Sequence, residues 1–179
     1  TVGNSSSNVL DRQAVNRYDL TSPFDISTCA FANDTVDLND DDLQNNSNAR
    51  DHDGDKKKNR AQGVEINDDG TKLFELMADA SFSGADGILE YNFSTPFDLS
   101  TISLVLNAGI ELPHATVSNS MNLEFSANGK RLFVLSHNSS VVAQISLDRP
   151  YDTSSFNIDG SVNLNDLSNL NQLRTVTFT

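Results

Sequence analysis

The residues best suited to hold a metal ion lie in the acidic stretch DHDGD. Asp51, Asp53 and Asp55 alternate along the chain, which is the spacing with which calcium loops present carboxylate oxygens to one ion. Such loops continue with a glycine and end with a glutamate, whereas this chain has Lys56 and Gln62 at the corresponding positions. Two interpretations remain open: a calcium site on the three aspartates, or a solvated loop whose acids are neutralised by the lysines that follow.

The other side chains that could do chemistry form no recognisable catalytic pattern. His52, His114 and His137 are far apart and lack the H-x-H and H-E-x-x-H spacings of metal sites, which indicates surface residues. The sequence contains no G-x-S-x-G elbow, P-loop or C-x-x-C pair. Glu65 and Glu124 occupy matching places in two alternating apolar segments, which favours a common structural or solvent-facing role. Spacing alone therefore identifies no catalytic dyad.

The composition limits the kinds of partner. The formal charge is −13, the pI is about 4.3, and aspartate outnumbers glutamate by twenty to five. A chain this acidic repels the phosphates of nucleic acid and suits divalent cations or basic surfaces instead. No apolar run reaches the length of a membrane-spanning helix. The single cysteine, Cys29, is predicted to be a small buried hydrophobe, with a reactive thiol as the alternative.

An eight-residue motif occurs three times and indicates that the structural elements of this chain are repeated. Its copies are TSPFDIST, STPFDLST and DRPYDTSS, and we call each copy a corner. Its recurring positions are a proline, an aromatic residue and an aspartate: Pro23, Phe24 and Asp25; Pro96, Phe97 and Asp98; Pro150, Tyr151 and Asp152. Proline ends a strand's pairing, and aspartate with the following serine can bind nearby backbone amides. We expect a structural corner with a buried aromatic; a repeated ligand site is the alternative.

A second element recurs between the corners. GVEINDDGTKLFEL matches MNLEFSANGKRLFVL, with Gly70 aligned on Gly129. Asp-Gly and Asn-Gly are typical of two-residue type I′ hairpins, in which both central residues take positive φ. Strands are predicted in the middle copy by alternation and by these turns. Their expected ranges are 63–67, 71–78, 87–93 and 102–106.

The repeat predicts an all-β chain of four-stranded antiparallel units, each about 54 residues long. Two units are complete and two are partial. The expected divisions are a leading segment with half a unit (1–38), an acidic polar insertion (39–59), two complete units (60–112 and 113–167) and the first strand of a further unit (168–179).

Together, QGVEINDDGTKLFEL and GILEYNFSTPFDLST resemble the blades of β-propeller repeat proteins of the YVTN and NHL kind, and STPFDLST resembles corners in bacterial and viral surface repeat proteins. The resemblance implies propeller blades that belong to a larger or assembled propeller, with further repeats or other protein subunits as partners. It implies a non-enzymatic scaffold or adhesive binding module of a secreted, cell-surface or virion structural protein. The alternative that it implies is a fragment of a lactonase-like, metal-dependent hydrolase, with Glu65 and Glu124 as the candidate acids.

Overall fold

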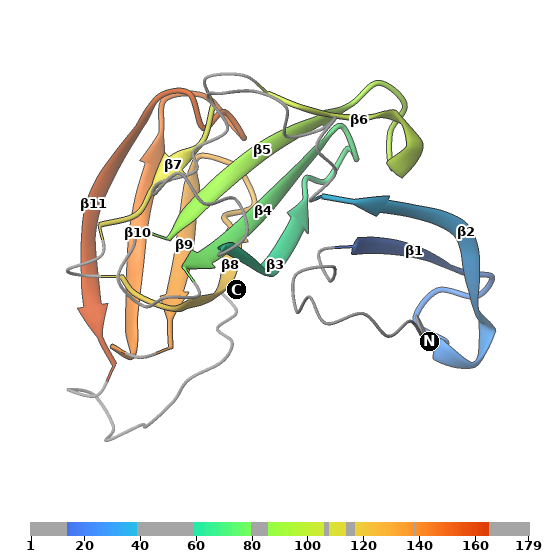
Figure 1. Ribbon diagram of the computed structural model, residues 1–179, viewed down its shortest axis with the longest axis horizontal. Helices are drawn as coiled ribbons and strands as arrows, with labels where there is room; N and C mark the ends of the chain where they lie inside the picture. The colour runs from blue at the N-terminus through green and yellow to red at the C-terminus, as the bar shows by residue number, and fades with distance from the viewer. Residues whose placement is uncertain are drawn as a thin grey trace.

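The protein is all-β in the part of the chain that the computed structural model describes, which comprises residues 14–38, 59–79, 86–105, 108–113, 117–137 and 139–164. The strands form three antiparallel sheets that follow one another in sequence order (Figure 1). We call them unit 1 (14–38), unit 2 (59–112) and unit 3 (120–164). The all-β prediction is therefore confirmed, and unit 3 is a four-stranded antiparallel sheet as expected.

The strands have the following bounds. Unit 1 contains β1 (Ala14–Leu20), the 3₁₀ turn η1 (Ile26–Thr28) and β2 (Cys29–Asp37). Unit 2 contains β3 (Asn59–Ile66), β4 (Lys72–Asp79), β5 (Gly87–Phe93), the 3₁₀ turn η2 (Leu99–Thr101), β6 (Ile102–Leu104) and β7 (Ile110–Glu111). Unit 3 contains β8 (Ser120–Phe125), β9 (Arg131–Ser136), β10 (Val141–Leu147) and β11 (Phe156–Asn163).

Units 2 and 3 share one strand order, because each strand pairs with the next strand in the chain. The fourth position of unit 2 is divided, since β6 pairs with one end of β5 and β7 with the other. In unit 3 the single long strand β11 fills that position. The first strand of unit 2 begins at Asn59 rather than at residue 63, so the strand reaches into the segment that the sequence assigned to the insertion.

The hairpins that join the first two strands differ from the expected type I′ turn. Gly70 and Gly129 have φ values of +70° and +66°, but neither Asp69 nor Asn128 has a positive φ. The Gly70 N–H donates to the Asn67 carbonyl at 2.9 Å, and the Gly129 N–H makes the equivalent bond at 2.7 Å. Each loop is thus a type I turn closed by a left-handed glycine. An Asx-Gly pair is compatible with a type I′ turn and with a type I turn followed by a left-handed glycine. The prediction of type I′ from this pair was therefore wrong.

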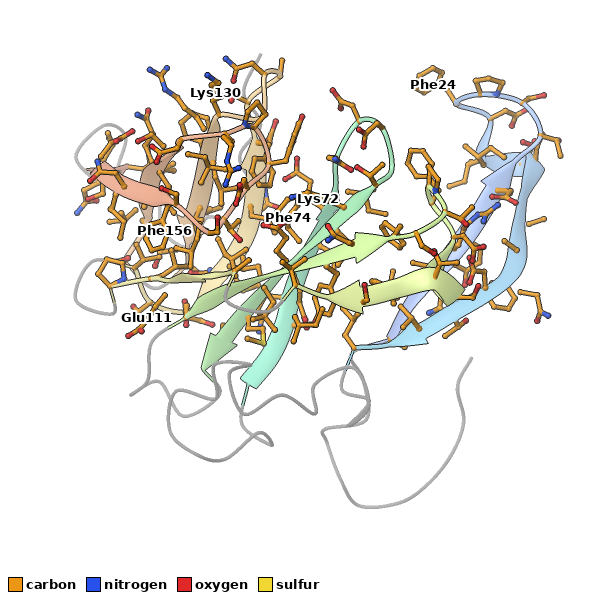
Figure 2. All side chains as sticks on the ribbon, turned by 90° about the horizontal axis from the view of Figure 1, so that it is seen from above. Phe24, Lys72, Phe74, Glu111, Lys130 and Phe156 are labelled. Atoms are coloured by element: carbon orange, nitrogen blue, oxygen red, sulfur yellow. The ribbon has the colours of Figure 1, made fainter. Side chains whose placement is uncertain are left out.

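Two apolar clusters join the units, and unit 2 lies between them. The cluster between units 2 and 3 contains Phe74, Leu76, Ile88, Ile110, Leu112, Val117, Leu123, Phe125, Leu132, Val134, Ala143, Ile145 and Leu147. The cluster on the other side contains Leu38, Leu73, Met77, Leu89, Tyr91, Phe93, Leu99 and Ile102. Figure 2 shows Phe74 between the sheets of units 2 and 3. Because unit 2 is covered on both sides, successive residues of β5 are buried, whereas β10 keeps a strict alternation.

Cys29 is exposed, so the prediction that it is buried is wrong. Its counterpart in unit 2 is Ile102, 73 residues later, which belongs to a buried cluster. Cys29 pairs in register with Leu20, which is also exposed, whereas Ile102 lies in the cluster that unit 1 covers. The burial of this position depends on a neighbouring unit rather than on the strand itself.

Replacing Gly70 by alanine should destabilise the fold for two separable reasons. A Cβ at Gly70 would lie 2.2 Å from Cε2 of Phe97, and the backbone is left-handed. We expect a loss of about 2–5 kcal/mol in the free energy of unfolding, of which ~1–2 kcal/mol is the backbone part. In a Phe97→Ala background only the backbone part should remain, as denaturant titration of the four proteins would measure.

Gly63→Ala is the matched control, because its Cβ would meet nothing closer than 3.4 Å. An equal cost of Gly70→Ala in both backgrounds would contradict the close contact between ring and glycine.

Candidate functional site

The three corners share one backbone conformation. The aromatic residues Phe24, Phe97 and Tyr151 have φ values of +61°, +60° and +55°, in the left-handed region that side-chain-bearing residues seldom adopt. Each costs about 1–3 kcal/mol of backbone strain. A strained conformation that recurs three times has to be maintained by its surroundings, so contacts around each corner must offset the strain.

The aspartate of each corner holds the turn that follows. Asp25 Oδ1 accepts the Ser27 N–H at 3.0 Å and the Ser27 hydroxyl at 2.6 Å. The Asp98–Ser100 and Asp152–Ser154 pairs repeat both bonds. The Ser27 hydroxyl and N–H lower the pKa of the Asp25 carboxyl from its ordinary value, and Ser154 does the same for Asp152. These carboxylates are engaged within their own turns.

The corner aromatic covers the hairpin glycine of its own unit. The Phe97 ring lies against Gly70 and the Tyr151 ring against Gly129, and in each pair the aromatic N–H donates to the glycine carbonyl, at 2.9 and 2.8 Å. Tyr151 also packs against Phe125, with the ring centroids 5.1 Å apart. Only a residue without a Cβ leaves room for such a ring. The hairpin and the corner, which the sequence presented as separate repeats, form one joint.

The expectation that all three corner aromatics are buried is wrong. Phe24 is fully exposed, Phe97 is 46% exposed and Tyr151 is half-buried. Figure 2 shows Phe24 at the outer end of the unit 1 corner, away from the other sheets. Phe97 and Tyr151 lie on a glycine, whereas the described part of unit 1 has no hairpin glycine for Phe24. In units 2 and 3 the aromatic thus covers a turn at the edge of the sheet, and only Tyr151 also packs against the core.

Each corner of units 2 and 3 is bound by an acid and a cation of the preceding unit. In unit 1, Arg17 donates to the Phe97 carbonyl at 3.3 Å, and Asp34 Oδ2 accepts the Leu99 N–H at 3.1 Å. Arg17 and Asp34 also form an ion pair at 3.5 Å. We call this arrangement a corner clamp: an ion pair whose cation binds the aromatic carbonyl and whose acid binds the N–H two residues further on.

The corner of unit 3 is held in the same way. Lys72 Nζ donates to the Tyr151 carbonyl at 2.8 Å and forms an ion pair with Glu90. Glu90 Oε2 accepts the Thr153 N–H at 2.9 Å and the Thr153 hydroxyl at 2.8 Å. Glu90 and Thr153 are buried, so these bonds replace lost hydration and are strong. The two clamps thus use the same two backbone atoms of the corner.

The clamps leave no pattern in the repeated sequence, because their residues come from different strands. The cation lies on β1 in one clamp and on β4 in the other, and the acid lies on β2 or β5. An alignment of the repeats therefore matches Arg17 with Glu90, a residue of opposite charge. The feature that the clamps share is their chemistry, because units 1 and 2 each supply one acidic and one basic side chain to the next corner.

The two glutamates that the hydrolase hypothesis would use lie on adjacent first strands. Glu65 Oε1 accepts the Phe125 N–H of unit 3 at 3.1 Å. Burial raises the pKa of Glu65 above its ordinary value, with a further increase from the nearby charge of Glu124, while the Phe125 N–H lowers it. Glu65 therefore joins units 2 and 3 and is already hydrogen-bonded, as the predicted structural role requires.

Unit 2 also contains a buried polar pair. The Tyr91 hydroxyl donates to Glu75 Oε2 at 2.7 Å, and both residues are inaccessible to solvent. Burial, followed by the charge of Glu75, raises the pKa of the Tyr91 hydroxyl. Because Tyr91 belongs to the cluster against unit 1, this bond ties β4 to β5 within the interface.

Several predicted site residues lie outside the described residues. These are Asp51, Asp53, Asp55, His52 and His114. His137 directly follows β9 and is half-buried. In the described ranges, no group of three or more histidine, cysteine, aspartate or glutamate residues is arranged to hold a metal ion. The calcium site on the three aspartates stays a prediction.

Comparison with known proteins adds no family. No family model matches this chain, and no curated protein matches it at a significant level. The helices found in the described part of the chain are three-residue 3₁₀ turns, so none has the length or apolar character needed to cross a membrane.

Removing the cation of the second clamp should destabilise the fold. Lys72→Met leaves the buried Glu90 carboxylate without its counter-charge, at a cost of about 2–4 kcal/mol. Glu90→Gln combined with Lys72→Met should recover much of the loss, because the amide oxygen still accepts from Thr153. Urea titration of the single and double variants would measure both effects.

The exposed Lys130 is the matched control for that experiment, and Lys130→Met should change the free energy of unfolding by about 0.5 kcal/mol or less. The clamp would be energetically unimportant if Lys72→Met behaved like this control.

Glu65 should make the stability depend on pH. Its pKa is raised in the folded state, so its contribution is most favourable below the ordinary value of 4.5 and is lost as the pH rises through the folded pKa. Relative to Glu65→Gln, the wild-type chain should therefore lose stability as the pH rises above 4.5. Thermal melting of the two proteins across a pH series would detect the divergence, and parallel curves would contradict it.

Proposed function

We propose that this chain is a non-enzymatic scaffold or adhesive binding module of a secreted, cell-surface or virion structural protein, built from blades of the β-propeller type. The observation that carries the proposal is the corner clamp. The ion pairs Arg17–Asp34 and Lys72–Glu90, which have the charged groups best placed for chemistry, bind the backbone of the next unit instead. Their role is to join one sheet to the next.

The packing supports blades in particular. Successive antiparallel sheets follow one another in sequence order, with apolar clusters between them, as the blades of a propeller do (Figure 1). The first strands β3 and β8 lie against each other through the Glu65–Phe125 bond, as the innermost strands of neighbouring blades would. The negative charge suits a surface that meets basic partners or binds cations such as calcium.

The alternative function, a lactonase-like hydrolase, draws on Glu65 and Glu124. These residues are electrostatically coupled, which is the observation in its favour. However, Glu65 already accepts a backbone N–H from the next unit. Hydrolysis would therefore require an acid that also serves in packing, and the scaffold is the better supported proposal.

Location and activity together test the proposal. An antibody raised against the chain should label intact source cells or particles from outside, without permeabilisation. The purified chain should hydrolyse lactones and esters no faster than a Glu65→Gln/Glu124→Gln variant, with or without added divalent metal. Labelling that appears only after permeabilisation would contradict the surface role. Metal-dependent turnover that is abolished in the double variant would establish the hydrolase instead.

A further inference from the structure

Unit 1 exposes a face whose equivalent is buried in unit 2. Tyr18, Leu20 and Ile26 are 58%, 45% and 85% exposed. Their counterparts 73 residues later, Tyr91, Phe93 and Leu99, are 0%, 6% and 2% exposed, because unit 1 covers them. Phe31 stacks on Tyr18 with ring centroids 5.5 Å apart and extends the same exposed face. We call these four residues the open corner face.

Unit 3 exposes the other kind of face, whose equivalent in unit 2 packs against the unit that follows. A groove of about 540 Å³ opens on β10 and β11, and Phe133, Val142, Gln144, Asp159 and Val162 are among the residues that line it. We call these five residues the open sheet face. The repeat aligns its first three members with residues of unit 2 as follows: Phe133 with Phe74, Val142 with Ile88 and Gln144 with Glu90. Those three residues of unit 2 face unit 3.

Asp159 of the open sheet face and Arg131, which pairs in register with Ser146, provide the two groups of a corner clamp. Arg131 aligns with Lys72, the cation of the clamp between units 2 and 3. Asp159 lies on the outer strand of its unit, as Asp34 does in unit 1. Hydrogen bonds from Gln144, Ser146 and Asn157, and to a smaller extent the charge of Arg131, lower the pKa of the Asp159 carboxyl. Gln144 and Ser146 each donate to the Asp159 carboxylate at 2.8 Å and fix its position. Both Arg131 and Asp159 are exposed at this face.

We propose that two copies of this chain associate head to tail, with the open sheet face of one copy on the open corner face of the other. In this contact Asp159 accepts the Ile26 N–H, and Arg131 donates to the Phe24 carbonyl. These are the atoms that correspond to the bonds of Asp34 with Leu99 and of Lys72 with Tyr151. Val142 and Val162 cover Tyr18 and Leu20. The interface continues the one already present between units 1 and 2 and between units 2 and 3.

The proposed contact has a defined symmetry. It joins two different surfaces, so a pair of copies still has one open corner face at one end and one open sheet face at the other. Further copies can therefore add and form a ring or a filament. The inference rests on the proposed scaffold function, since a module that adds copies of itself extends the same stack of sheets. A second copy is the occupant with the required chemistry, because each chain presents both complementary faces.

Sedimentation of the purified chain tests the contact. The wild type should associate increasingly as its concentration rises. Tyr18→Asp and Val162→Asp each destroy one face and should each sediment as monomers. Ser103→Asp adds the same charge at an exposed site on β6, and should associate like the wild type. A mixture of Tyr18→Asp with Val162→Asp retains one intact contact and should form dimers but nothing larger.

Cys29 provides an independent readout, because it lies on the same side of unit 1 as Leu20, its partner in register, and is exposed. Under reducing conditions followed by a brief pulse of a thiol reagent, labelling of the wild type should slow as the concentration rises. Labelling of Val162→Asp should stay constant. This readout distinguishes the proposed face from association through any other surface.

Three results would overturn the inference: a wild type that stays monomeric up to millimolar concentration, face variants that associate like the wild type, or a mixture that forms no dimer. A monomeric chain without hydrolase activity would overturn this inference alone and leave the scaffold function standing. Metal-dependent hydrolysis would overturn the scaffold function whatever the state of association.

Discussion

The structure depends on the seating of an aromatic ring over a glycine at the edge of each complete sheet. The ring of Phe97 lies on Gly70, and the ring of Tyr151 lies on Gly129. In each pair both residues have a positive φ, which strains the aromatic residue but not the glycine. The contact fixes where the third strand ends and where the 3₁₀ turn or tight turn after it begins. The carbonyl and N–H groups of that turn are thereby held at the sheet edge, where a neighbouring unit can reach them.

From this joint follows the way in which the sheets are assembled. The apolar clusters between units are non-directional and would tolerate sliding of one sheet on another. The corner clamps are directional, because an acid and a cation must meet an N–H and a carbonyl at fixed positions. Hydrophobic burial thus supplies most of the stabilisation between units, and the clamps select one register. The same division of roles explains why charged residues that could do chemistry are found in packing.

Local sequence signals predicted the local structure well. The corners, the hairpin positions and four of the five strands of unit 2 follow from alternation, Asx-Gly pairs and the repeated Pro-aromatic-Asp motif. The turn type was wrong because Asx-Gly suits two geometries. The exposure of Cys29 and Phe24 was wrong because burial at those positions is decided by a neighbouring sheet or hairpin. The clamps could not be predicted, since Arg17 and Lys72 reach equivalent corners from different strands and share no place in the repeat.

Amide hydrogen exchange, measured residue by residue in dilute solution, tests whether each corner is held by the unit that precedes it. The N–H groups of Leu99 and Thr153 are held by the carboxylates of Asp34 and Glu90, whereas the equivalent N–H of Ile26 lies on an exposed corner. The three residues occupy equivalent positions in the three corners, so differences in local backbone geometry are largely removed. We expect slow exchange at Leu99 and Thr153 and fast exchange at Ile26. Equal rates at the three positions would contradict this expectation, because the corners would then be ordered by their own turns and not by the units that precede them.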